Sequence, residues 1–178
     1  MVVADAARRP HREALRKGRR SVARTCYFVT SRAARRGTDV LIRGEAPWII
    51  IEALRWLHDA GRIRLMGYCV MPDHLHFLMV LLEGSGLTGV MHSFGSFTGH
   101  RIVEATTARP PVWDEGYHDH AIRNEREFRT RLAYMHDNPV RAGLVGQAEE
   151  WPYSTAHEDL AHDIDWAWWE GVERGIRI

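Results

Sequence analysis

Two histidines lie two residues apart in the apolar segment 71–79. Side chains of a β-strand point alternately to opposite faces, so His74 and His76 share one face while Leu75 and Phe77 point to the other. Two imidazoles on one face supply half of a divalent metal site. Such pairs also occur on ordinary strands, so the metal site depends on a second group of residues.

The second group lies on a predicted helix, which begins with a capping pattern at Asn124 and ends where Asn138 meets Pro139. At helical spacing, an apolar stripe contains Phe128, Leu132 and Met135, and an adjacent polar stripe contains Glu127, Arg131, Tyr134 and Asn138. Tyr134 and Asn138 therefore face the same way. A simpler interpretation is a Glu127–Arg131 ion pair, a half-buried Tyr134 and an Asn138 that only ends the helix.

Together the two groups predict a site for phosphodiester chemistry. His74, His76 and the amide oxygen of Asn138 would leave positions open for a phosphate oxygen and water, as Mg²⁺ or Mn²⁺ prefers. Tyr134 lies one turn from that amide, where a nucleophile is needed. Because phenols are mostly protonated at neutral pH, the metal ion would have to make the phosphorus more electrophilic.

The elements that must position these residues follow from periodicity and turn signals. We expect a strand at 26–30, a helix at 48–60, a hairpin of strands 63–71 and 74–82, a helix around 90–102, an edge strand at 117–122 and the helix described above. This order predicts an α+β fold, a ferredoxin-like antiparallel sheet with helices on one face.

The charge is unevenly distributed along the 178 residues, although the net charge is only +1. Basic residues crowd the segment 8–24, in which Glu13 is the single acid, and acids gather after residue 148. Such an arm is either a solvated terminus or a segment that lies along nucleic-acid phosphates. We expect a basic arm (1–21), one domain (22–146) and a tail (147–178), whose aromatic residues Trp151, Tyr153, Trp166, Trp168 and Trp169 dock on the domain.

The cysteines and the hydropathy of the sequence predict the cellular compartment of the protein. Cys26 and Cys69 fit no zinc or redox spacing and fall in apolar strand-like runs, which predicts buried free thiols in a reducing environment. The sequence contains neither a long apolar run nor a secretory apolar region, so we expect a cytoplasmic protein without a membrane partner.

Four separated motifs carry a family resemblance: segments 68–78, 113–123, 134–145 and 151–155. In this order they resemble the single-tyrosine HUH transposases, specifically the REP-associated tyrosine transposases, over residues 22 to 160. The resemblance implies a ferredoxin-like HUH endonuclease domain that acts on single-stranded DNA with Mg²⁺ or Mn²⁺. It implies His74 and His76 as metal ligands and Tyr134 as the nucleophile that forms a 5′-phosphotyrosine. Asn138 stands where related insertion-sequence transposases often place a glutamine as third ligand.

Two features depart from the family pattern. Residues 93–99 of the second helix contain no basic residue before His100 and Arg101, so we expect weaker DNA contact through this helix than in the family. His118 and His120 form a second same-face pair, which either supports the site and contacts DNA or binds a metal ion itself. The residues expected to contact DNA are Arg16, Arg19, Arg20, Arg24, Arg101 and Arg131.

The expected function is that of a transposase, a metal-dependent endonuclease and strand-transferase acting on single-stranded DNA with hairpins formed by repetitive extragenic palindromic (REP) sequences. The alternative is a domesticated hairpin-binding protein with weak or no nuclease activity. A metallohydrolase of small phosphoesters would leave the basic arm and Tyr134 without a role, so we expect no small-molecule substrate. Because a docked tail could cover the surface that related insertion-sequence dimers use, we expect a monomer, with a dimer as the alternative.

Overall fold

The structure is a computed structural model that describes residues 21–167. The predicted DNA contacts Arg16, Arg19 and Arg20, and the tail residues Trp168 and Trp169, lie outside the described residues. The elements are β1 (Cys26–Arg32), α1 (Ala46–Asp59), β2 (Ile63–Val70), β3 (His74–Leu81), α2 (Leu87–Ala105), β4 (His118–Ala121), α3 (Glu125–His136), α4 (Asn138–Arg141) and the short 3₁₀ helices η1 (Ala148–Glu150) and η2 (Glu158–Asp163).

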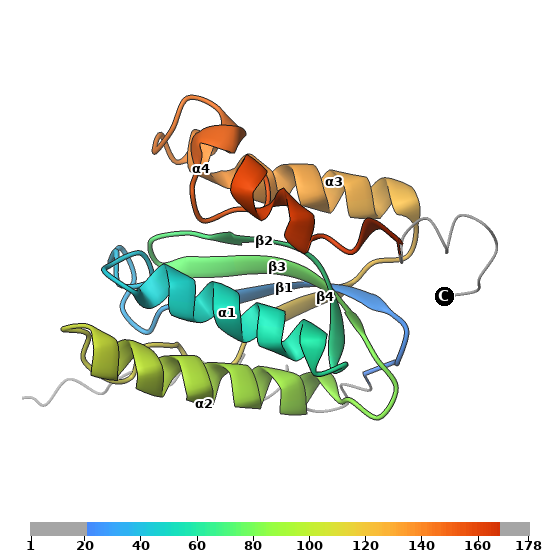
Figure 1. Cartoon of the computed structure of the whole chain (residues 1–178), viewed down its shortest axis with the longest axis horizontal. Coiled ribbons are helices and arrows are strands. Elements are labelled where there is room, and N and C mark those ends of the chain that lie inside the picture. Colours follow the sequence, from blue (N-terminus) through green and yellow to red (C-terminus); the bar gives the residue numbers. More distant parts are fainter. Residues whose placement is uncertain (1–20, 168–178) are drawn as a thin grey trace, which may run out of the picture.

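The four strands form one antiparallel sheet in the order β2-β3-β1-β4 (Figure 1). α1 connects β1 to β2, which are separated in the sheet by β3, and α2 connects β3 to β4, which are separated by β1. Both helical connections therefore cross over one intervening strand. This is the ferredoxin-like arrangement, and the predicted α+β fold is confirmed. The register places Thr30 of β1 opposite both His76 of β3 and His118 of β4, so these three residues form one row across the sheet.

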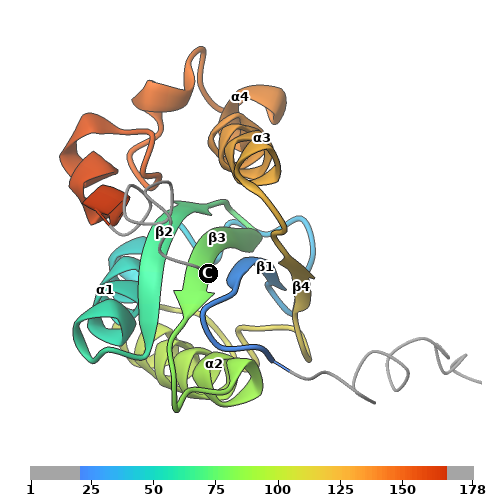
Figure 2. The same cartoon turned by 90° about the vertical axis from the view of Figure 1, so that its right-hand side faces the viewer.

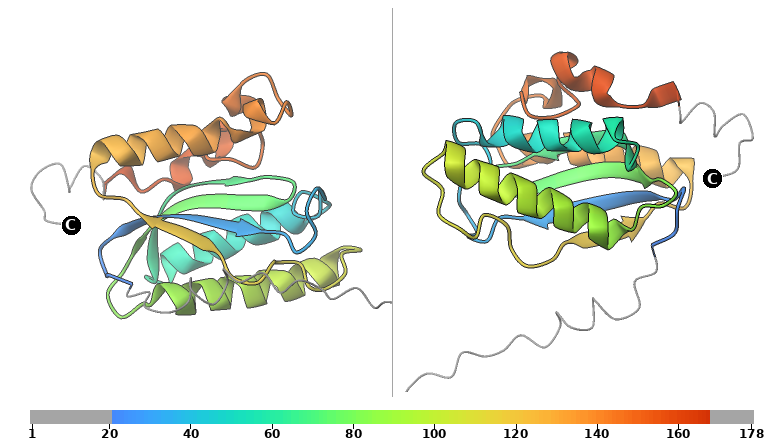
Figure 3. Two further views of the ribbon diagram at one scale, coloured as in Figure 1. Left: turned by 180° about the vertical axis from the view of Figure 1, so that it is seen from behind. Right: turned by 60° about the horizontal axis from the view of Figure 1, so that its bottom comes forward.

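Helices cover both faces of the sheet. α1 and α2 lie on one face over a core that includes Ile50, Phe77 and Phe94, whereas α3 lies on the opposite face, where its Phe128 belongs to a second core with Phe28 of β1 (Figures 1 and 2). The expectation of helices on one face therefore holds for α1 and α2 but is wrong for α3. The reason is that β1 and β3 are apolar on both faces, and each apolar face must be covered. Figure 3 shows the two helical layers from behind and from below.

A glycine lets α3 approach the sheet closely. Gly67 has a φ of +132° at a register shift in β2, and a Cβ added there would come within 3.0 Å of Leu132 and 3.1 Å of Met135. A larger residue would require the ends of these side chains to shift slightly, and it would also be strained by the positive φ. The glycine therefore favours close packing of the helix that carries Tyr134 on the sheet.

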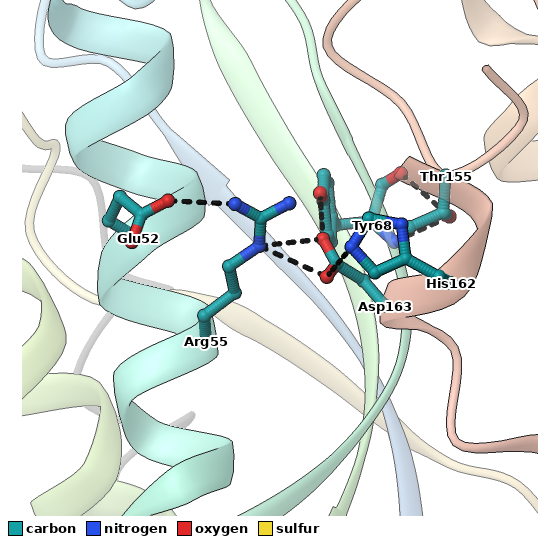
Figure 4. A network of polar contacts seen from close by, with 6 residues as sticks. All are labelled: Glu52, Arg55, Tyr68, Thr155, His162 and Asp163. Carbon is teal, nitrogen blue, oxygen red and sulfur yellow. Dashed lines mark hydrogen bonds and ion pairs between the residues drawn. The ribbon is translucent and has the colours of Figure 1, made fainter. Parts of the chain in front are cut away.

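The chain after α4 is fastened to β2 and α1. The Tyr68 hydroxyl donates to Asp163 (2.5 Å), and Arg55 of α1 donates to the same carboxylate (3.0 Å) and to Glu52 (2.8 Å) (Figure 4). Burial, together with the neighbouring Asp163 carboxylate, raises the pKa of Tyr68, so its hydroxyl stays a donor. Nearer to α4 along the chain, the indole of Trp151 donates to the carbonyl of Val70 (2.9 Å). The described part of the tail is thus packed against the domain.

Cys26 and Cys69 are free and buried, as predicted. Burial raises the pKa of each thiol to about 12. Across residues 21–167, none of the helices combines the length and the apolar character that crossing a membrane requires.

Candidate active site

The two histidines of β3 lie side by side at the end of the strand. Their ring centroids are 4.7 Å apart, as expected for neighbours on one strand face. His76 is 6% exposed, whereas the side chain of His74 is 25% exposed. One imidazole is therefore held inside the protein and the other lies at its surface, so the pair forms the edge of an accessible site.

Each imidazole is oriented through its Nδ1 atom. His76 Nδ1 lies 2.8 Å from the hydroxyl of Thr30, and His74 Nδ1 lies 2.8 Å from a carboxylate oxygen of Asp73. When Nδ1 carries the proton in these bonds, Nε2 of each ring keeps its lone pair. Burial, and secondarily the charges of His74 and Arg32, lowers the pKa of His76 to about 3. Its ring is neutral at physiological pH, and neutral imidazole is the form that binds metal ions.

Tyr134 of α3 lies against this pair. Its ring centroid is 5.9 Å from that of His76 and 6.3 Å from that of Phe28, and the residue is 37% exposed. The guanidinium of Arg141 lies over the Tyr134 ring, 5.0 Å from the centroid. The structure thus brings together the two histidines and the tyrosine that the sequence predicted as one site.

Asn138 is placed differently from the prediction. α3 ends at His136, and Asn138 is the first residue of the short helix α4, where Pro139 occupies the first turn. Proline fits that turn because its missing N–H would be unpaired there in any case. Nδ2 of Asn138 donates to the carbonyl of Tyr134 (3.1 Å), which leaves its Oδ1 available as a ligand. Within residues 21–167, no hydrogen bond or ring contact joins Asn138 to His74 or His76.

The candidate donor set for a divalent cation consists of two imidazoles and one amide oxygen. In the described part of the chain, no group of three or more His, Cys, Asp or Glu side chains could hold a metal ion. A structural zinc site of that kind is therefore absent between residues 21 and 167. Two imidazoles with one amide oxygen leave room for phosphate and water, which suits Mg²⁺ or Mn²⁺.

In the second histidine pair, His118 and His120, the imidazole of His120 is bonded to a residue of α3. Nε2 of His120 bonds Oε1 of Glu127 (2.6 Å), and the other oxygen of Glu127 accepts from the backbone N–H of Arg123 (2.9 Å). These bonds lower the pKa of Glu127. They also link β4 to the first turn of α3, which supports the helix that carries Tyr134. The Glu127–Arg131 ion pair of the simpler interpretation is not formed, and the Arg131 guanidinium lies over the Phe28 ring instead, 5.7 Å from its centroid.

The arginines expected to contact DNA are spread out. Arg131 stacks beside the site, whereas Arg24 lies 3.8 Å from Glu83 and Arg101 pairs with Glu104 (2.9 Å) on α2. Neither Arg141 nor Thr30 was among the residues predicted from the sequence. Arg141 falls inside the motif 134–145, three residues after Asn138, and could have been considered from that spacing. Thr30 carried no signal, because its contact with His76 depends on strand register.

Comparisons with known proteins agree with the motifs. No protein-family model matches the chain. The chain is 34% identical over 105 residues to the REP-associated tyrosine transposase of Escherichia coli K12, and the match covers 56% of this chain and 60% of that protein. A Haemophilus influenzae Rd protein provisionally given the same name is 29% identical over 111 residues, covering 55% of this chain and 63% of its own length. The chain thus spans less than two thirds of each curated relative.

A comparison with solved structures finds the same fold in another protein. The REP-associated tyrosine transposase bound to a REP hairpin superposes with a TM-score of 0.69 at 24% identity, over 82% of this chain and 85% of that one. The protein is therefore similar in sequence to REP-associated tyrosine transposases and shares their fold, which confirms the family resemblance predicted from its motifs.

Proposed function

We propose that the protein is a metal-dependent single-stranded DNA endonuclease and strand-transferase that acts on hairpin-forming REP DNA through a 5′-phosphotyrosine. The observation that carries the proposal is the 5.9 Å separation between the rings of Tyr134 and His76, with His74 beside them. Similarity to transposases, including one bound to a REP hairpin, supports a DNA hairpin as the partner.

The metal ion would be held by His74 and His76, with the amide oxygen of Asn138 as a third ligand. When bound, Mg²⁺ or Mn²⁺ polarises the scissile phosphate and balances its charge. Thr30 and Asp73 orient the two rings through Nδ1, so that both Nε2 atoms can act as ligands.

Tyr134 performs the covalent step. Its hydroxyl oxygen attacks the phosphorus and loses its proton, while the bond from phosphorus to the 3′ oxygen breaks and that oxygen is protonated. Arg141, 5.0 Å from the ring centroid, favours negative charge on the phenol and on the attacked phosphate. The phosphotyrosine conserves the energy of the broken bond, so a 3′ hydroxyl can reverse the step without ATP.

The test is formation of a covalent complex. The full chain is incubated with a labelled single-stranded hairpin oligonucleotide and Mn²⁺ and analysed on a denaturing gel. We expect a shifted band that disappears in Tyr134→Phe. Tyr153→Phe is the matched control, because Tyr153 packs between Trp48 and Trp151 and is not part of the site. A band that persists in Tyr134→Phe would contradict the proposed nucleophile.

The second candidate is a hairpin-binding protein with weak or no nuclease activity. It is favoured by the position of Asn138, whose short amide donates to the carbonyl of Tyr134 and, among the described residues, forms no hydrogen bond with either histidine. The same experiment separates the two functions. Hairpin binding by the wild-type protein without a covalent band would support the second candidate.

A further inference from the structure

A hollow of about 690 Å³ opens beside His74. It is formed by the loop after β1, the turn between β2 and β3, the segment after α2 and the segment after α4. Volumes of this size are typical of sites for small organic groups. His74 lines the hollow, and its ring centroid lies 4.7 Å from that of His76, so the hollow adjoins the proposed site through His74.

One side of the hollow is basic. Arg35, Arg43 and Arg109 line it. Arg43 is paired with Asp39, but none of the described carboxylates forms an ion pair with Arg35 or Arg109. Arg35 instead donates to the backbone carbonyl of Arg109 (3.1 Å), which joins the loop after β1 to the segment after α2. Two arginines without acid partners among the described residues therefore line the same side of the hollow, where their charge favours a phosphate.

The other side is apolar. Pro111, Ala142 and Leu144 contribute exposed apolar surface to it, and Met71 and Val112 are buried behind them. Apolar surface beside guanidinium groups is the combination that binds a nucleotide, because the base packs on one part and the phosphate pairs with the other. Bases of a duplex remain stacked inside it, so only an unpaired nucleotide could place its base here.

We propose that this hollow binds one unpaired nucleotide of the DNA strand that adjoins the scissile phosphate, with its base against Pro111, Ala142 and Leu144 and its phosphate on Arg35 and Arg109. The inference rests on the proposed function for the identity of DNA as the ligand. It adds the location of a base-binding subsite and two phosphate-binding residues outside the predicted set.

The first experiment identifies the nucleotide without cleavage. Full-length Tyr134→Phe protein is incubated with a hairpin DNA pool whose single-stranded flanks are randomised, and the bound fraction is sequenced. An abasic sugar is then placed at each flanking position of a selected DNA. We expect one position at which the abasic sugar weakens binding roughly tenfold, the effect of removing one stacked base.

The second experiment assigns that position to the hollow. Arg35→Gln combined with Arg109→Gln, in the same background, should lower the slope of log affinity against log salt by about 0.7 for each phosphate that the two arginines no longer neutralise, and should abolish the abasic effect. Arg36→Gln is the matched control, since Arg36 is exposed next to Arg35 but does not line the hollow. It should keep the abasic effect.

The outcomes separate this inference from the proposed function. If the paired variant and the Arg36 control bind equally, or if no flanking position responds to an abasic sugar, the inference is wrong even when wild-type protein forms the covalent band. If the abasic effect depends on Arg35 and Arg109 but the wild-type protein forms no covalent band, the subsite stands and the proposed chemistry does not.

Discussion

The guanidinium of Arg141 lies 5.0 Å from the ring centroid of Tyr134, so the last residue of α4 places its positive charge against a side chain of the preceding helix α3. Asp137, between α3 and α4, has a helical backbone, so the chain continues to turn and brings Arg141 close to Tyr134. The same junction places the Asn138 amide against the carbonyl of Tyr134. One short segment therefore positions the proposed nucleophile, its cation and a potential metal ligand.

Replacing Arg141 tests whether the cation assists the chemistry. Arg141→Gln should slow formation of the covalent band roughly 3- to 30-fold, in line with a cation–π contact of about 0.5–2 kcal/mol. Arg141→Lys should be intermediate, because it keeps the charge but not the planar group. Single-turnover rates at saturating DNA measure this. Arg126→Gln, an exposed position on α3, is the control, and an equal decrease there would indicate a general charge effect.

The histidine pair should be needed for cleavage rather than for binding. His74→Ala and His76→Ala should each abolish the covalent band, while hairpin affinity changes by no more than about threefold, because affinity comes from many backbone contacts. EDTA should have the same effect on the wild-type protein. Gel assays and fluorescence anisotropy measure the two quantities. Parallel decreases in binding and cleavage in both variants would argue against the assigned role.

The Thr30–His76 hydrogen bond should tune metal affinity. Thr30→Val removes the partner of Nδ1 with little change in volume, and the Mn²⁺ concentration needed for half-maximal activity should rise about 10- to 100-fold. Thr30→Ser should restore it. A merely structural role predicts reduced thermal stability without a shift in the Mn²⁺ requirement, so both are measured.

The amide of Asn138 should modulate the site rather than determine it. Asn138→Ala should retain partial activity because water can replace one neutral ligand, whereas Asn138→Asp should change the preference between Mg²⁺ and Mn²⁺ by adding a charge. Cleavage rates across a metal titration measure this. Unchanged rates and metal preference in both variants would remove Asn138 from the coordination sphere.

The buried thiols should be inert in the native protein. Burial raises the pKa of Cys26 and Cys69 to about 12 in the folded state, above the ordinary thiol value of 9.0. The folded state therefore keeps both thiols protonated, and this contribution to stability is complete below about pH 9 and declines as pH rises toward 12. Mass spectrometry after iodoacetamide treatment at pH 8 should find neither cysteine modified until urea is added. Rapid labelling of the native protein would show that one of the strands opens readily.

Local patterns in the sequence determined much of the molecule. The alternation around His74 and His76 placed both rings on one strand face, and the Asn124 cap is formed, with its side chain accepting from the N–H of Glu127 (2.9 Å). The stripe containing Phe128 and Met135 is buried as predicted. These features depend on residues a few positions apart, whose geometry the backbone period fixes.

Other features were decided only by the tertiary structure. The packing of α3 opposite α1 and α2, the pairing of Thr30 with His76, and the hollow beside Arg35 and Arg109 all join residues far apart in the chain. Strand register and the face on which a helix packs depend on how two apolar sheet faces are covered at once, which no local period specifies. The sequence thus identified the candidate site residues, whereas the fold determined which neighbours orient them.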